Sequence, residues 1–248
     1  RRGPAPRARA VRRARSAPRQ ATHGAATATI CRMAPPPVGT PVPLDEALPM
    51  APGTSPFRVK GPVYQKMKED TDRECGEGRL RERLGDPALR ESFDQPFFAS
   101  VWYDALPITP LAIAHARLVG VPMHTHCREK GRGVAGQDVP GIYRALLRLF
   151  SPVTLVGRLP RAATFYFDFG ASDLEWLDER HARTTLSAVP ASVAPVLAGV
   201  IEGFMAMALE LTRAPDVHVR TLEVVYDGGV LFDVPTAAIR HECRWGRR

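Results

Sequence analysis

The residues with the most specific chemistry lie close together in the segment HTHC, residues 124–127. In an extended segment, successive side chains point to opposite faces, so His124 and His126 would point the same way and Cys127 the other way. Imidazole and thiolate groups bind zinc, and a zinc-bound water would support metal-assisted hydrolysis. No carboxylate follows at the H-x-H-x-D-H spacing. A solvated helix end without a metal is therefore the alternative.

A second candidate site is apolar. Aromatic and methionine side chains recur through the middle and C-terminal parts of the chain, and such side chains line small-molecule pockets. The candidate pocket residues are Tyr143, Phe150, Phe165, Phe167, Trp176, Phe204, Met205 and Met207. Four arginines that could meet an acidic head group at the pocket mouth are Arg144, Arg148, Arg158 and Arg161. Residue types do not distinguish a hollow cluster from a filled core, so a plain core is the alternative.

The segment GRGVAG, residues 131–136, matches the pattern G-x-G-x-x-G. A dinucleotide site needs a strand directly before this pattern and a helix that begins at it. Here CREK precedes the pattern, and Gln137, Asp138 and Pro140 follow it. The flanks therefore favour a flexible loop over a cofactor site.

The charge is unevenly distributed along the 248 residues. Lysine and arginine total 34 against 26 acidic residues, but residues 1–32 hold nine arginines and no acid, which leaves 25 basic residues against all 26 acids in the remainder. The Arg-rich segment lacks the apolar run of a secretory signal, and it would suit a transit peptide, a phosphate-binding arm or an open frame upstream of a start at Met33 or Met50. Nucleic acid is expected as a partner only through this segment.

We expect residues 1–56 to form a disordered Arg- and Pro-rich tail and linker, and residues 57–248 to form one α+β domain. Phe57 and Val59 alternate as in a short strand before Gly61-Pro62. Helices are predicted at 110–119, where Gly120 ends the helix, at 141–150, and at 152–169, where Pro160 should kink or split the helix and Gly170 should end it. This part is expected to be a helical bundle.

Antiparallel hairpins are predicted to follow and to pack on a long apolar helix. The segments DLEWLDER and ARTTLSAV form one expected hairpin, and HVRTLEVVY and VLFDV form a second one around Asp227-Gly228-Gly229, with IRHECRW as a last strand. Residues 196–211 form the apolar helix, which is too short and too close to Pro190 and Pro195 for a membrane span. Gly199 and Gly203 would admit a close neighbour, and Glu202 must be exposed, paired or functional.

Three of these segments carry a resemblance to a known family. They are FRVKGPVY, GIYRALLRLFSPVTLVGRLPRAATFYFDFG and VPASVAPVLAGVIEGFMAMALELTRAPDVHVR. The chain resembles a paralogous family of myxobacterial proteins of unknown function, about 200 residues long, and the layout is distantly similar to the ligand-sensor domains that include the haem nitric-oxide-binding and vinyl-reductase-like modules. The resemblance departs at the closing VLFDVPTAAIRHECRWGRR.

The similarity to haem nitric-oxide-binding domains makes haem the cofactor to consider. The sequence has neither a Tyr-x-Ser-x-Arg motif for propionates nor a C-x-x-C-H motif, and His115 and His181 are the remaining axial candidates. We expect no cofactor.

The sequence thus predicts a non-enzymatic sensory or regulatory domain that binds a small apolar or amphipathic ligand or a protein. The alternatives are a metal-assisted hydrolase built on His124, His126 and Cys127, and a protein-interaction scaffold. Because the four cysteines are far apart in a chain with a large core, we expect reduced thiols and a cytoplasmic location.

Overall fold

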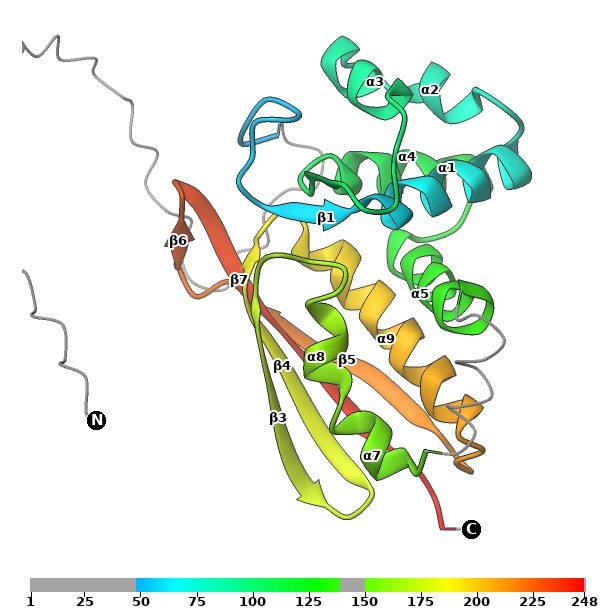
Figure 1. Ribbon diagram of the computed structural model, residues 1–248, viewed down its shortest axis with the longest axis vertical. Coiled ribbons are helices and arrows are strands. Elements are labelled where there is room, and N and C mark those ends of the chain that lie inside the picture. Colours follow the sequence, from blue (N-terminus) through cyan, green and yellow to red (C-terminus); the bar gives the residue numbers. More distant parts are fainter. Residues whose placement is uncertain (1–47, 139–149, 248) are drawn as a thin grey trace, which may run out of the picture. The chain divides into compact units, whose positions relative to one another are not determined.

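The computed structural model describes residues 48–138 and 150–247, and it confirms an α+β fold (Figure 1). The helices are α1 (Gly61–Cys75), α2 (Arg79–Arg83), α3 (Pro87–Asp94), α4 (Ile108–Val119), α5 (Met123–Gly133), the π-helix η1 (Val134–Asp138), α7 (Pro152–Val156), α8 (Leu159–Ala163) and α9 (Ala194–Leu211). The strands are β1 (Arg58–Lys60), β2 (Trp102–Asp104), β3 (Ala171–Asp178), β4 (His181–Pro190), β5 (His218–Val225), β6 (Val230–Leu231) and β7 (Val234–Arg244).

The helices of the first half begin and end at residues that suit these positions. The predicted short strand is β1, which pairs antiparallel with β2, and α1 begins directly after it with proline in the first turn. Asp86 caps α3 by accepting a hydrogen bond from the amide of Ala88 (2.8 Å). Gly120 ends α4 in the left-handed conformation (φ 72°). The expectation of helices in this half is confirmed by α1 to α5.

One antiparallel sheet with the strand order β3-β4-β7-β5 follows. The hairpin β3–β4 is confirmed, and the predicted last strand is the long central strand β7. The second predicted hairpin is wrong, because β5 pairs with residues 238–244 of β7 rather than with residues 230–234. Phe232 and Asp233 both have positive φ (52° and 61°), so they form the two-residue turn that joins β6 to β7. A Phe-Asp turn gives no signal of the Asn-Gly kind, which is why the sequence pattern missed it.

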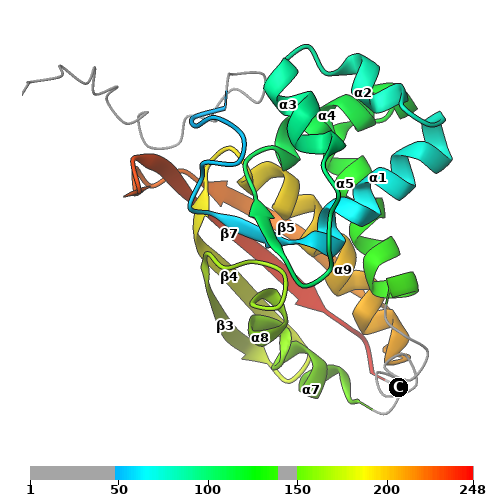
Figure 2. The ribbon, with the colours of Figure 1, turned by 45° about the horizontal axis from the view of Figure 1, so that its top comes forward.

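The apolar helix α9 runs along one face of this sheet and contacts β5 and β7 (Figure 2). Among the described helices, α9 alone is long and apolar enough to cross a membrane, but most of it is buried inside the fold. Its burial is that of a core helix. Leu197 packs in a cluster with residues of α1 to α4, and Leu209 in a second cluster with Leu155, Val156 and Trp245.

Helix α5 packs on α9 with almost no side-chain layer between the two backbones. A Cβ added to Gly203 would lie 1.8 Å from the carbonyl oxygen of Arg128, and one added to Gly131 would lie 2.0 Å from that of Val200. A Cβ on Gly199 would lie 2.8 Å from the Cβ of Cys127. The close approach predicted for Gly199 and Gly203 is confirmed, and α5 is the element that makes it.

Two further expectations concern this region. The flexible loop expected at residues 131–136 is wrong, because α5 continues to Gly133 and η1 follows. The buried contact of Gly131 with α9 keeps this segment helical. The helix expected at 152–169 is split into α7 and α8 near Pro160, as predicted, but α8 already ends at Ala163, and Phe167 forms a β-bridge with Val59 instead of continuing the helix. The helix expected at 141–150 lies almost wholly outside the described residues, and residues 1–47 lie outside them too.

Replacement of Gly203 by alanine tests the α5–α9 contact. The new methyl group would overlap the Arg128 carbonyl, so we expect Gly203→Ala to lower the free energy of unfolding by about 1–3 kcal/mol in urea titrations. Gly133→Ala, also on α5, is the matched control: no described atom lies within 4 Å of the added Cβ, and the stability should stay equal or rise by up to about 1 kcal/mol. Equal losses in both variants would contradict the packing argument.

Candidate ligand-binding cavity

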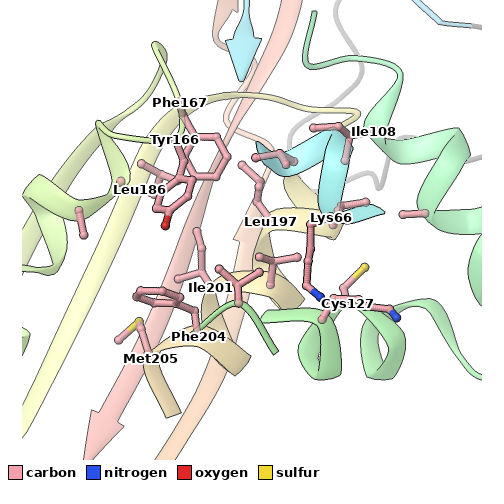
Figure 3. A pocket seen from close by; sticks show the side chains of 18 of the residues that line it. Lys66, Ile108, Cys127, Tyr166, Phe167, Leu186, Leu197, Ile201, Phe204 and Met205 are labelled. Carbon is pink, nitrogen blue, oxygen red and sulfur yellow. The ribbon is translucent and has the colours of Figure 1, made fainter. Parts of the chain in front are cut away.

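A cavity of about 510 Å³ lies between the helices of the first half, α8, α9 and the strand β4 (Figure 3). This volume is within the range of small-molecule sites, about 300–1,000 Å³. The cavity is lined by members of both core clusters, such as Leu186 and Leu197 from the first and Met205 from the second. It is therefore a space that the two clusters leave open between them.

Most of the cavity wall is apolar. Tyr166 and Phe167 lie on one side with Leu186, while Ile201, Phe204 and Met205 of α9 line its base (Figure 3). Polar groups near this part include Thr184, whose hydroxyl is directed to the sulfur of Met205 (3.9 Å). A surface of this kind favours the aliphatic or aromatic part of a ligand.

Charged side chains from α1 and α5 form the opposite end, where Lys66 is seen (Figure 3). Lys66 Nζ donates to Asp70 Oδ1 (2.8 Å), and Lys130 Nζ donates to both carboxylate oxygens of Glu74 (2.5 and 2.6 Å). Burial alone would raise the pKa of Asp70, but the hydrogen bond from Lys66 and the charge of Lys130 outweigh it and lower this pKa. Lys130 likewise lowers the pKa of Glu74 against the effect of burial.

His115 of α4 is fully engaged in this network. Its Nε2 donates to Glu74 Oε2 (3.1 Å), and its Nδ1 shares a hydrogen bond with the Thr71 hydroxyl (3.0 Å). Burial and the charge of Lys130 lower the pKa of His115, which favours the neutral ring. We refer to Lys66, Asp70, Glu74, His115 and Lys130 as the polar network.

His126 of α5 lies beside the polar network and lines the cavity. Its side chain is buried, with 6% of the residue exposed, and its ring meets that of His115 edge to face with 4.3 Å between centroids. Burial, followed by His115 and Lys130, lowers the pKa of His126 to about 4, so the ring is neutral at pH 7. Neither ring nitrogen has a hydrogen-bond partner among the described residues.

The structure does not bring together the three residues of the predicted metal site. Because α5 is a helix rather than an extended segment, His124 and His126 point in different directions: His124 is half exposed and meets Glu202 (3.5 Å), while Cys127 is buried against Gly199. Burial raises the pKa of the Cys127 thiol to about 12. In residues 48–138 and 150–247, no group of three histidine, cysteine or acidic residues is placed to hold a metal ion, so the hydrolase hypothesis has no site there.

The predicted apolar residues divide into two groups. Phe167, Phe204 and Met205 line the cavity. Phe165 is 73% exposed, Trp176 is 40% exposed and packs on Trp245, and the lining residues include neither of them nor Phe150 nor Met207. Helical spacing alone gave no means of telling which face of each segment is buried. Tyr143 lies outside the described residues.

The predicted arginine mouth is not found among the described residues. Arg158 is exposed and stacks over the ring of Phe150 (4.6 Å), and Arg161 is also exposed; neither lines the cavity. Arg144 and Arg148 lie outside the described residues. Glu202, the buried acid predicted to need a partner, accepts hydrogen bonds from the amide (2.7 Å) and hydroxyl (2.9 Å) of Thr221 and pairs with Arg128 (3.0 Å).

The polar network was missed by the sequence analysis. Its one sequence signal is the spacing of Lys66, Asp70 and Glu74, which places them on one face of a helix at i, i+4 and i+8. This spacing is also typical of a solvated face, and only the packing of α4 and α5 against α1 encloses it.

No protein-family model and no curated protein sequence matches the chain. Solved structures do match it. The K. algicida H-NOX protein, Fe(II) unliganded, aligns with a TM-score of 0.56 and 8% identity over 76% of this chain and 97% of its own. A mutant of the T. Tengcongensis H-NOX aligns with a TM-score of 0.55 and 10% identity, over 76% and 98%. An oxygen-binding H-NOX domain related to soluble guanylate cyclases gives 0.52 and 10%, over 76% and 95%.

These comparisons show a fold shared with H-NOX domains. The expected similarity in layout to haem nitric-oxide-binding domains is confirmed at the level of the fold. Membership of the myxobacterial paralogous family stays a prediction.

The described cavity residues do not fit a haem group. Both nitrogens of His115 are engaged, and His181, the other axial candidate, pairs with Glu242 (2.9 Å) and does not line the cavity. His126 lacks the carboxylate or carbonyl partner that normally orients a metal-ligating histidine. No arginine among the described residues lines the cavity, and Lys66 and Lys130 are already paired with acids, so two propionates would find no free cation among these lining residues.

The low pKa of His126 predicts a pH dependence of stability. The pKa of His126 is about 4 in the folded state and near 6.5 in the unfolded state. As the pH falls, the His126 ring is therefore protonated in the unfolded chain before it is protonated in the folded one. The free energy of unfolding should therefore decrease between pH 6.5 and 4, with His126 contributing on the order of 2–3 kcal/mol.

Urea titrations at intervals from pH 7 to pH 4 would measure this effect. His126→Gln should show a shallower decrease in the free energy of unfolding. Part of the decrease should remain, because the pKa values of His115 and His241 are also lowered. Parallel curves for the wild type and His126→Gln would contradict the assignment.

Proposed function

We propose that this domain is a sensory or regulatory module that binds a small apolar or amphipathic molecule in the cavity between α1, α5, α8 and α9. The observation that carries the proposal is the cavity itself: about 510 Å³ of space with a mostly apolar wall and one polar end. A core filled only for stability is close-packed and leaves few voids larger than a water molecule.

The fold supports this proposal by analogy. One of the structures with the same fold is described as an oxygen-binding H-NOX domain in its oxygen complex, so a protein with this architecture binds a small ligand. In the present chain the lining differs, and the ligand proposed is organic rather than a haem-bound gas.

Binding without catalysis is part of the proposal. Cys127, the thiol in the cavity wall, is a poor nucleophile because burial raises its pKa to about 12. The three described cysteines, Cys75, Cys127 and Cys243, are unpaired, which is consistent with the reducing cytoplasm that we propose as the location.

A cavity-filling variant tests the proposal. Ala163 lines the cavity from α8, so the indole of Ala163→Trp should occupy the ligand space and weaken binding of the apolar dye Nile red at least tenfold in fluorescence titrations. Thr164→Trp is the matched control, because Thr164 is adjacent, exposed and absent from the cavity wall, and binding should be unchanged.

Native mass spectrometry of the purified full-length wild type should also detect a co-purifying organic mass that Ala163→Trp lacks. Equal dye affinity in the two tryptophan variants would contradict the proposed site.

A further inference from the structure

Among the described residues at the charged end of the cavity, His126 is the buried polar side chain without a partner, and Glu69, which also lacks one, is exposed to solvent. Lys66, Asp70, Glu74 and Lys130 are paired with one another, and His115 uses both nitrogens. His241 of β7 also lines the cavity, and its Nε2 donates to the carbonyl of Ala198 (3.0 Å). His126 is more than nine-tenths buried and lines the cavity, and its side chain has no hydrogen-bond partner among the described residues.

A buried polar group without a partner is costly, so a partner supplied from the cavity would be favoured. We propose that His126 is the hydrogen-bonding anchor for the head group of the ligand, and that this ligand is an aliphatic molecule with an uncharged hydroxyl head. The inference rests on the proposed function, since it names the ligand class for the same cavity.

The charge balance of the site favours an uncharged head group. Lys66, Arg73 and Lys130 form ion pairs with Asp70 and Glu74, and Glu69 adds a third negative charge, so no cation among the described lining residues is left unpaired. A carboxylate head would add a negative charge beside Asp70 and a neutral imidazole. The cost of placing an uncompensated charge in a largely buried site exceeds that of placing a hydroxyl group.

A hydroxyl group also matches the chemistry of a neutral imidazole. One imidazole nitrogen donates a hydrogen bond and the other accepts one, and a hydroxyl can take either role. The aliphatic part would extend from this end along the apolar side chains of α9, where Ile201, Phe204 and Met205 lie (Figure 3). Head and tail of the ligand would thus each meet a matching surface.

Displacement of Nile red from the full-length protein measures the affinity for three probes of equal chain length: octan-1-ol, octane and octanoate. His126→Leu removes both ring nitrogens and should weaken octan-1-ol about tenfold while octane binds as tightly as before or more tightly. His124→Leu is the matched control, since His124 lies on the same helix but does not line the cavity, and it should change neither affinity.

A second measurement does not depend on any variant. The side-chain nitrogen resonances of His126 in the wild type, observed by ¹⁵N NMR, should shift when octan-1-ol is added and stay unchanged with octane. This readout remains decisive if His126→Leu fails to fold.

The outcomes separate the two proposals. Octanoate binding more tightly than octan-1-ol, an equal effect of His126→Leu on alcohol and alkane, or displacement of the dye by none of the probes would overturn the His126 assignment while the cavity remains a ligand site. If Nile red itself does not bind the wild type, the proposed function fails.

Discussion

The contact between the backbones of α5 and α9 is the constraint on which the rest of the structure depends. Three glycines remove the side-chain layer that normally separates two helices, so Gly131, Gly199 and Gly203 bring the two backbones into direct contact. This approach fixes the rotation of α5 about its own axis. Cys127 is consequently buried against α9, and His126 is directed to the cavity instead of to solvent.

The same contact explains how a polar network is tolerated within the fold. With α5 held against α9, Lys130 reaches Glu74 of α1, and Glu74 in turn orients His115 of α4. Three helices are thereby joined by charge-assisted hydrogen bonds at one end of an apolar space. The positive and negative charges of the network balance, which keeps the cost of burial low. The neighbouring imidazole of His126 is left without a hydrogen-bond partner in the described part of the chain.

The fold shared with H-NOX domains does not bring a haem site with it among the described residues. The chain aligns with H-NOX structures over 76% of its length at 8–11% identity, yet its described cavity residues include no set that suits haem. Backbone architecture depends on the apolar pattern and on close contacts, which many sequences satisfy. Ligand choice depends on a few side chains in the cavity wall, and these vary independently of the architecture.

The sequence by itself determined the α+β class, the β3–β4 hairpin, the buried helix α9 and its glycine contacts, because periodicity and glycine spacing are local properties. It did not determine the pairing of β5 with β7, since the Phe232-Asp233 turn carries no turn signal. Nor did it determine which aromatic residues line the cavity: Phe167 does and Phe165 does not, although they are two residues apart. The polar network was decided by tertiary structure alone, because its members come from three helices and their sequence spacing is the same as that of a solvated helix face.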